Sequence, residues 1–364
     1  MKTIKFKDFV KLQRGFDLPK SKRINGAFPL VASTKIDGSH SEYKVKAPGV
    51  VTGRSGSLGQ VQYITKDFWP LNTTLWAKDF KENNEKYVYY FLQTLDLAQY
   101  NSGAGVPTLN RNHLDELEIS IHNHEQQLEI SMFLSSYDKL IENNNRRIAI
   151  LEDMAQSLYR EWFVNFRYPN HEDNLNADGN PKLIDSPLGQ IPEGWEVKRL
   201  DDYVTLQRGF DLPKAKRNNE GDVPIYAASG LTGYHDEIKA KGPGVVTGRS
   251  GTLGIVKLVL EDHWPLNTSL WVKKFENCTA HYAYYLLDSI GLERFNSGAS
   301  VPTLNRNDVH GNPVIAPTNN VIDKFENIVS VKHKQINVLK RKNENLKQQR
   351  DMLLPKLISG TIAL

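Results

Sequence analysis

Two long segments of the chain share a hydrophobic pattern of seven residues. In 125–163, which lacks Gly and Pro, apolar side chains recur at two positions of each heptad, and a weaker copy of the pattern spans 320–358. Such a pattern predicts helices that pair along a coiled-coil seam. The expected seam residues are Leu134, Ile141, Asn144, Ile148, Leu151, Leu158, Ile336, Leu339, Asn343, Leu346 and Leu353. We expect the two asparagines to fix the register, and Pro355 to end or kink the second helix.

Shorter patterns fill the rest of the chain. Apolar runs broken by Gly and Asn turns predict strands, and one buried face over Glu85–Leu95 predicts a short helix. The expected strands include Val50–Thr52, Val61–Ile64, Thr73–Trp76 and Glu118–Ile121. A stretch rich in Asn, Asp, Pro and Gly, 165–192, is typical of a connector.

The chain contains one domain twice. LQRGFDLPK occurs at 12–20 and unchanged at 206–214, an offset of 194 residues. The stretch 49–76 returns at 244–271 with 19 of 28 positions identical, and NSGAGVPTLNRN (101–112) returns as NSGASVPTLNRN (296–307), both at an offset of 195. One extra residue therefore lies in the loop of the second copy that corresponds to Ile24–Phe28. A period of this length is a whole domain with its connector.

The two long segments are complementary in charge. The first carries seven acidic and four basic residues, and the second carries four acidic and nine basic residues. We infer that they pair with each other, antiparallel, because each follows an equivalent domain. The predicted fold is a mixed α+β (α/β) chain with two similar globular domains, two long helices that form an antiparallel coiled coil, and a pseudo-two-fold internal repeat. The expected boundaries are 1–121 for the first domain, 122–168 for the central helix, 169–192 for the linker, 193–317 for the second domain and 318–364 for the C-terminal helix.

Composition narrows the class of protein. The chain has 364 residues, 39% of them hydrophobic and 24% charged, and a formal net charge of +4. This balance favours globular domains and permits a nucleic-acid partner. The only cysteine, Cys278, rules out an intrachain disulfide and a cysteine-cluster metal site. Without an apolar run of about 18 residues, we expect no membrane partner and a soluble cytoplasmic protein.

Motifs of catalysis are absent from the sequence. It has no phosphate-binding loop, dinucleotide fingerprint, nucleophile elbow or zinc-protease helix. His40 with Glu42, and His235 with Glu237, recur in both copies and could hold a metal or act as a general base. A polar loop is the favoured interpretation, because neither pair has a third ligand. We therefore predict no catalytic residue and no metal site.

Glycine-rich and basic motifs are the candidates for DNA contact. GRSGSLG (53–59) and GRSGTLG (248–254) could be tight turns after a strand, or could place Arg54 and Arg249 on DNA. They lack the lysine of a nucleotide-binding loop. Other basic residues interleave with Gly and Pro, which favours display on loops. The DNA-binding candidates are Arg14, Lys20, Lys22, Arg23, Arg54, Ser55 and Arg111, with Arg208, Lys214, Lys216, Arg217, Arg249, Ser250 and Arg306 in the second copy.

The motifs together resemble a known family over essentially the full chain. GVVTGRSGSLG, WPLNT-x-LW, and SGA-x-VPTLNR before a long helix are similar to the specificity subunits of type I restriction–modification systems. LGQIPEGWEVKRL (188–200) resembles the usual entry to a second target recognition domain, and DMLLPKLISG (351–360) resembles the usual ending of the second helix. The segments that open the two helices, 121–130 and 316–325, depart from the family pattern.

The resemblance implies a non-catalytic DNA-recognition subunit. Each domain would read one half of a split double-stranded DNA target. The helices would set the spacing and dock two DNA methyltransferase subunits, to which restriction-translocase subunits can add. The chain itself would need no cofactor, since S-adenosylmethionine and ATP with Mg would belong to the partners. A 39-residue helix spans about 58 Å, or about 17 base pairs, which is an upper limit for the unread gap.

Near-identical domains related by a two-fold axis should read near-identical half-sites. We therefore predict an interrupted palindrome, or a target close to one, with differences arising where the copies diverge, at Ile24–Lys46 and Asn218–Lys241. Three alternatives stay open at this point. They are a stand-alone recognition subunit of a type II-like system, a duplicated hydrolase that uses the His–Glu pairs, and a two-domain interaction protein that never binds DNA.

Overall fold

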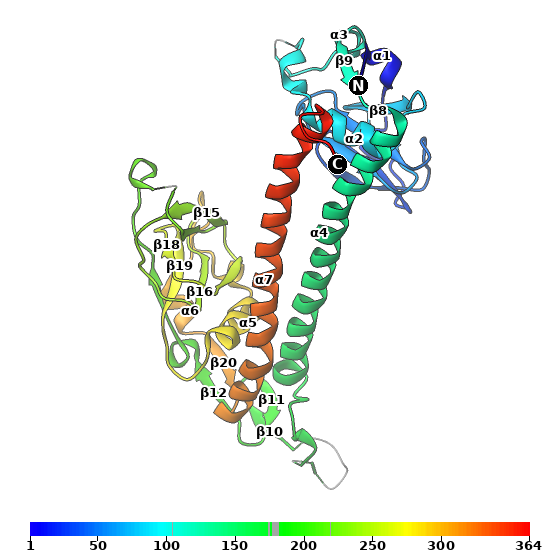
Figure 1. The fold of residues 1–364 in the computed structure, drawn as a ribbon. Helices are drawn as coiled ribbons and strands as arrows, with labels where there is room; N and C mark the ends of the chain where they lie inside the picture. Colours follow the sequence, from blue (N-terminus) through cyan, green and yellow to red (C-terminus); the bar gives the residue numbers. More distant parts are fainter. Residues whose placement is uncertain (104, 174, 177–181, 219) are drawn as a thin grey trace. The chain divides into compact units, whose positions relative to one another are not determined.

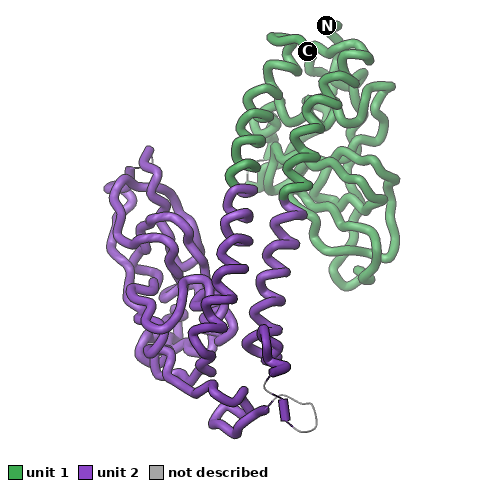
Figure 2. The backbone as a smooth tube through the Cα atoms, turned by 60° about the horizontal axis from the view of Figure 1, so that its bottom comes forward, with its two compact units in different colours: residues 1–144, 341–364 green, residues 145–340 purple. Residues whose placement is uncertain are grey.

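The computed structural model describes residues 1–364 except 104, 174, 177–181 and 219. The chain divides into two compact units, coloured green and purple in Figure 2. Unit 1 comprises 1–144 with 341–364, and unit 2 comprises 145–340. Each unit therefore contains one globular copy together with part of both long helices.

Two small sheets and a strand pair build the globular part of unit 1 (Figure 1). The antiparallel four-stranded sheet has the order β2 (Lys11–Arg14), β8 (Thr74–Asp79), β5 (Gly49–Gly53), β6 (Val61–Ile64). The three-stranded sheet has the order β4 (Ile36–His40), β3 (Phe28–Val31), β7 (Trp69–Pro70), and β1 (Lys2–Lys5) pairs with β9 (Glu118–Ile121). The helices are α1 (Phe6–Phe9), α2 (Glu85–Thr94), α3 (Arg111–Asp115) and the first part of α4 (His124–Tyr159).

Unit 2 repeats this arrangement strand for strand. Its four-stranded sheet has the order β13 (Val204–Arg208), β19 (Ser269–Phe275), β16 (Gly244–Gly248), β17 (Val256–Val259), and its three-stranded sheet has the order β15 (Gly230–His235), β14 (Val223–Ala227), β18 (Trp264–Pro265). β12 (Glu196–Arg199) pairs with β20 (Pro313–Ala316), and the helices are α5 (Ala280–Ile290), α6 (Arg306–His310) and the first part of α7 (Asn319–Ile358). The connector adds the hairpin β10 (Leu183–Ser186) and β11 (Gly189–Pro192), and residues 174 and 177–181 of the predicted linker lie outside the described residues.

The short helix after the four-stranded sheet joins each sheet to the long helices. α2 begins at the cap residue Asn84, whose side chain accepts a hydrogen bond from the N–H of Tyr87 at 2.9 Å. The cap satisfies a helix N–H that has no partner within the helix. The fully buried Tyr87 and Tyr90 of α2 belong to one core cluster with Leu134 of α4 and Leu357 of α7. In unit 2, Thr279 caps α5 in the same way, and the equivalent cluster is rich in aromatic side chains.

In each unit the long helices lie antiparallel, in agreement with the predicted fold class. In unit 1, the Nδ2 of Asn144 donates to the Oδ1 of Asn343 at 2.9 Å. In unit 2, Ile148 packs with Ile336 and Leu339. Of the expected seam residues, Leu134, Ile141, Ile148, Ile336, Leu339 and Asn343 are buried, and Asn144, Leu151, Leu158, Leu346 and Leu353 are half-buried.

Pro355 lies near the C-terminal end of the second long helix. Of the two predicted effects of Pro355, an end of the helix is wrong, because α7 continues through it to Ile358, and a kink stays a prediction. Proline costs one backbone hydrogen bond in a helix, and here it stands in the last turn, where buried Leu354, Leu357 and Ile358 hold the helix against the core of unit 1. α4 ends in a π-helical turn, Arg160–Val164.

Candidate nucleic-acid interface

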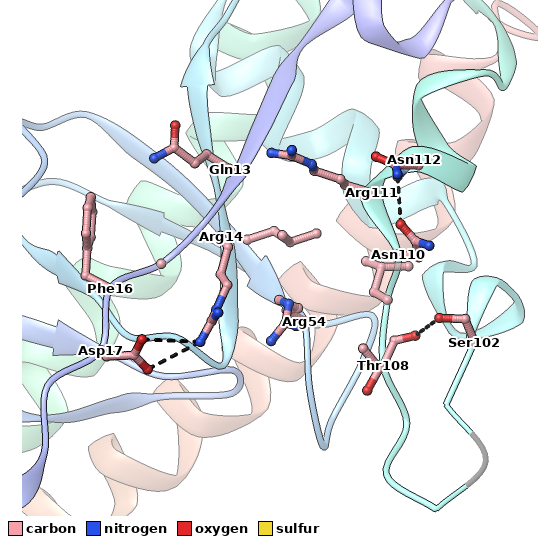
Figure 3. A pocket seen from close by; sticks show the side chains of 13 residues that line it. Gln13, Arg14, Phe16, Asp17, Arg54, Ser102, Thr108, Asn110, Arg111 and Asn112 are labelled. Atoms are coloured by element: carbon pink, nitrogen blue, oxygen red, sulfur yellow. Dashed lines mark hydrogen bonds and ion pairs between the residues drawn. The ribbon is translucent and has the colours of Figure 1, made fainter.

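Three arginines from distant parts of the sequence meet at one cavity of unit 1 (Figure 3). Arg14 ends β2, Arg54 follows β5, and Arg111 opens α3. The cavity has a volume of about 690 Å³ and also exposes the polar side chains of Gln13, Asp17, Ser102, Thr108, Asn110 and Asn112. With three guanidinium groups and one carboxylate among its lining residues, it is a positively charged hollow suited to an anionic ligand.

A carboxylate orients one of these arginines. The Nη2 of Arg14 lies 3.3 Å from the Oδ1 of Asp17, and the side-chain amide of Asn72 donates to the same oxygen. Both ion-pair partners are more than half exposed, so the pair positions the guanidinium and adds little stability. Arg54 is held differently, because its Nη1 donates to the carbonyl of Asn72 at 3.3 Å.

The glycine-rich motif after β5 is a tight turn rather than a phosphate cradle. The N–H groups of Arg54 and Ser55 both donate to the carbonyl of Thr73, at 2.8 and 3.1 Å, and the N–H of Gly56 donates to the carbonyl of Pro107 at 2.9 Å. Gly56 has a φ of +88°, which favours glycine there. Because these amides already have acceptors, the turn offers an anion the side chain of Arg54 instead of its backbone.

The 101–112 loop supplies the opposite wall of the cavity. The Oδ1 of Asn101 accepts hydrogen bonds from the N–H groups of Gly103 and Thr108, at 2.9 and 2.8 Å. Asn110 then caps α3 by accepting from the N–H of Asn112 at 3.0 Å. The cap places Arg111 at the first position of the helix, so this motif shapes the loop and presents the arginine. Residue 104 lies outside the described residues.

The second copy contains the same set of residues without a single substitution. All 13 residues that line the cavity of unit 1 have identical counterparts in unit 2, at offsets of 194 or 195. Their interactions recur as well. Arg208 lies 3.7 Å from Asp211, the side-chain amide of Asn267 donates to Asp211, and Arg249 donates to the carbonyl of Asn267 at 3.3 Å. Asn305 caps α6, which Arg306 opens.

The remaining basic candidates are not among the 13 cavity-lining residues that the two copies share. Lys20, Lys22, Lys214 and Lys216 are exposed on equivalent 3-10 turns, Lys20–Lys22 and Lys214–Lys216. Arg23 is half-buried against Asp37. In unit 2, Lys214 and Arg217 line a separate hollow of about 530 Å³. Ser55 and Ser250 are half-buried, and each bridges to the loop that follows, at Thr108 and Thr303.

Sequence reasoning missed the polar residues around the arginines. Gln13, Asp17, Asn110 and Asn112 line the cavity, and Asn72 holds both Asp17 and Arg54. All five are identical in the two copies of the domain. Identity between the two copies was therefore the signal that could have found them.

The His–Glu pairs have a local structural role. His40 is buried, its Nδ1 lies 3.1 Å from the backbone nitrogen of Ile24, and its ring packs edge-on against Trp69. His235 lies in the same way beside Asn218 and Trp264. Glu42 and Glu237 are exposed. In the part of the chain that the structure describes, no group of three His, Cys, Asp or Glu side chains is placed to hold a metal ion.

Comparison with known proteins decides the family. Residues 1–153 and 192–341 match the type I restriction modification DNA specificity domain. The chain belongs to this specificity family. As a specificity subunit of a type I restriction–modification system, it recognises DNA and has no catalytic role of its own.

The similarity extends over most of the specificity subunit. The chain is 26% identical over 309 residues to the type I restriction enzyme MjaIX specificity subunit of Methanocaldococcus jannaschii, which covers 76% of this chain and 69% of that protein. It is 20% identical over 356 residues to the HindI specificity subunit of Haemophilus influenzae, covering 77% and 75%. The crystal structure of the S subunit from M. genitalium has the same fold, with a TM-score of 0.67, 20% identity, and coverage of 98% and 96%. No helix in the described part of the chain combines the length and apolar character that a bilayer crossing requires.

Proposed function

We propose that each unit reads one half of a bipartite, near-palindromic DNA target through its arginine-lined surface. The observation that carries the proposal is the identity of all 13 lining residues in the two copies. Identical donors and acceptors on the same scaffold favour the same bases. We infer that the two domains bind DNA about a pseudo-two-fold axis, so that they read the same bases on opposite strands and the target is an interrupted palindrome.

The side chains in the cavity have the chemistry that reading DNA needs. Arginine donates two hydrogen bonds to guanine or to a phosphate, and the amides of Gln13, Asn110 and Asn112 match adenine. Exposed lysines beside the cavity are suited to phosphates, which position a protein on the duplex. The proposed DNA contacts are Arg14, Lys20, Lys22, Arg23, Arg54, Ser55 and Arg111, with Arg208, Lys214, Lys216, Arg217, Arg249, Ser250 and Arg306.

The long helices have exposed apolar side chains that a partner protein could cover. Met132, Leu140, Ile150 and Met352 are each more than half exposed. Exposed apolar side chains on these helices are available for contact with a protein partner. We propose that they dock two DNA methyltransferase subunits, with restriction-translocase subunits added to that complex. S-adenosylmethionine and ATP with Mg then belong to the partners, and the complex works in the cytoplasm, on the cell's DNA.

Methylome sequencing tests the proposal. The chain is expressed with its neighbouring methyltransferase in a methylation-free host, and the methyltransferase alone is the control. A bipartite motif that appears only with both proteins is the expected result. Two proteins that both express but do not copurify would contradict the docking of methyltransferase on the helices.

A variant separates DNA reading from assembly. Replacing Arg14, Arg54 and Arg111 by Ala should abolish methylation of the motif while copurification with the methyltransferase persists. Unchanged methylation would contradict the assignment of the cavity to DNA. Among the described residues, nothing favours the hydrolase or a protein that does not bind DNA.

A further inference from the structure

The two copies differ at one charged pair beside the shared surface. Arg23 and Arg217 are equivalent, and each follows its 3-10 turn directly. The facing strands are β4 and β15, which both end at an equivalent buried histidine, His40 or His235. Three residues before that histidine, the first copy has Asp37 and the second has Thr232.

In the first copy, the arginine is neutralised. The Nη1 of Arg23 donates to the Oδ2 of Asp37 at 2.8 Å and to its carbonyl at 3.3 Å. The hydrogen bond from Arg23 lowers the pKa of the Asp37 carboxyl, and the charges of Arg23, Lys35 and Lys20 add to this effect. The side chain of Asp37 is 40% exposed. It therefore presents an ionised acceptor to solvent beside an arginine whose charge it offsets.

In the second copy, no carboxylate among the described residues neutralises the arginine. The Nη2 of Arg217 lies 3.5 Å from the carbonyl of Leu212, and within the described residues no carboxylate forms an ion pair with it. Thr232 donates instead to the carbonyl of Ile225 at 3.3 Å. Arg217, Lys214 and Thr232 line the hollow of about 530 Å³.

This hollow adjoins the shared DNA-reading surface. Asp211 is among its lining residues, and the counterpart of Asp211 in the first copy, Asp17, lines the arginine cavity. Asn267 also lines the hollow and donates to Asp211. A duplex that contacts the shared arginines of the second domain therefore passes next to Thr232. The equivalent position of the first domain is Asp37.

We propose that Asp37 and Thr232 make the two half-sites differ, on a surface that is otherwise the same in both domains. The inference rests on the proposed function. A carboxylate only accepts hydrogen bonds, so it selects a base amino group, that of cytosine or adenine. An arginine without a carboxylate partner prefers the two acceptors of guanine. The first domain selects cytosine or adenine at this position, and the second domain selects guanine at the equivalent position of its half-site.

The test is selection of bound DNA from a randomised library by the complex of the full chain with its methyltransferase. Asp37→Thr and Thr232→Asp are compared with the unmodified chain. Each should change one half of the motif only, and the two should change opposite halves, with base preference shifting on the order of 10-fold. Asp37→Thr gains guanine, and Thr232→Asp gains cytosine or adenine.

Two matched variants complete the test. Ile36→Leu introduces the neighbouring residue of the second copy without changing charge, and it should leave the motif unchanged. Ser39→Tyr introduces the residue that the second copy has on the same face of the strand. If Ser39→Tyr changes the motif while both charge variants select the original motif, the inference is overturned.

Failure of the proposed function looks different from failure of this inference. If the unmodified complex selects no bipartite motif, the proposed function is wrong, and the inference falls with it. If a motif appears but its halves are identical, only the inference is overturned. If Asp37→Thr does not fold, as judged by thermal unfolding, Thr232→Asp gives the same test in the other domain, where no ion pair is lost.

Discussion

The two copies have the same side chains at the arginine cavity but different side chains where the short helix, α2 or α5, contacts the long helices. In unit 1, the hydroxyl of Tyr90 donates to Asp138 at 2.5 Å, and Arg350 donates to the other oxygen of Asp138 at 2.6 Å. In unit 2, the equivalents of Tyr90 and Asp138 are Tyr285 and His333, whose hydroxyl and Nε2 are 2.7 Å apart.

The difference extends to the partner helix. The residue of α4 that is equivalent to Arg350, at the offset of 195, is Ala155. It is fully buried and carries no charge. The acid and its arginine are thus both present in unit 1, and in unit 2 both are replaced. The cavity has the same side chains in both copies, which the proposed function attributes to a shared DNA ligand. The two contacts between the short helix and the long helices use different side chains, because each needs only to satisfy its own buried groups.

The largest expected effect tests whether the two cavities are equivalent. Replacing the three cavity arginines by Ala in one copy should weaken specific binding by about 100-fold at moderate salt, and the same change in the other copy should weaken it equally. The slope of log affinity against log salt should fall by up to about 3, because each lost phosphate contact removes about 0.9. Binding titrations at several salt concentrations measure both.

Lys81→Ala is the control for this prediction. Lys81 lies outside the cavity and is paired with Asp79 at 3.0 Å. It should leave affinity and salt slope unchanged. A large loss from one arginine triplet and none from the other would break the equivalence of the copies.

The pH dependence of stability should distinguish the contact between Tyr285 and His333 in unit 2 from the contact between Tyr90 and Asp138 in unit 1. Burial, and then the charge of His281, lower the pKa of His333 from 6.5 to about 4. Between these values the unfolded chain binds a proton that the folded chain does not, so the stability of unit 2 falls as pH drops from 6.5 to 4. The expected loss is about 2 kcal/mol after allowance for partial exposure.

Denaturant unfolding at pH 7 and pH 4.5 measures this loss. Two other titratable side chains lie in this region. The ring of His281 packs against the ring of His333, and the Nδ1 of His281 is within hydrogen-bond distance of the carboxylate of Glu326. His333→Gln keeps a polar partner for Tyr285 and should reduce the acid sensitivity. Equal sensitivity in the variant would show that another group causes it.

Arg350→Ala should destabilise unit 1. The substitution leaves the carboxylate of Asp138 half-buried without its cation, at a cost of about 1–2 kcal/mol. Adding Asp138→His recreates the combination of unit 2 and should recover part of the loss. Thermal unfolding of the single and double variants measures the coupling. A double variant that is less stable than Arg350→Ala alone would contradict the account.

The smallest effect concerns the asparagine pair between the helices. Replacing Asn144 and Asn343 by Leu should raise the free energy of unfolding by about 1 kcal/mol, because a polar pair in a seam is retained for register rather than stability. Chemical unfolding gives the change in stability. A loss of stability would show that the 2.9 Å hydrogen bond between them is the stronger contribution.

The sequence predicted the elements with strong periodicity or exact repetition. The heptads gave the long helices to within a few residues, and β5, β6, β8, β9 and α2 lie where apolar runs placed them. Pro355 does not end α7, because tertiary packing of the last turn outweighs one lost hydrogen bond.

Contacts between distant segments were beyond the reach of the sequence. Arg14, Arg54 and Arg111 were chosen individually, but only the fold brings them to one cavity. Asn72 was not among the predicted site residues, because its contacts with Asp17 and Arg54 join loops that are far apart in the chain. The different partners of Arg23 and Arg217 likewise depend on the facing strand.

The most direct test of the central claim makes the two reading surfaces the same. Residues 24–46 are replaced by those of 218–241, and the bound motif is determined with the methyltransferase present. If the shared cavity and the neighbouring loop together read the bases, this chain selects a perfect interrupted palindrome. Two halves that still differ would contradict the account, because residues elsewhere would then determine specificity.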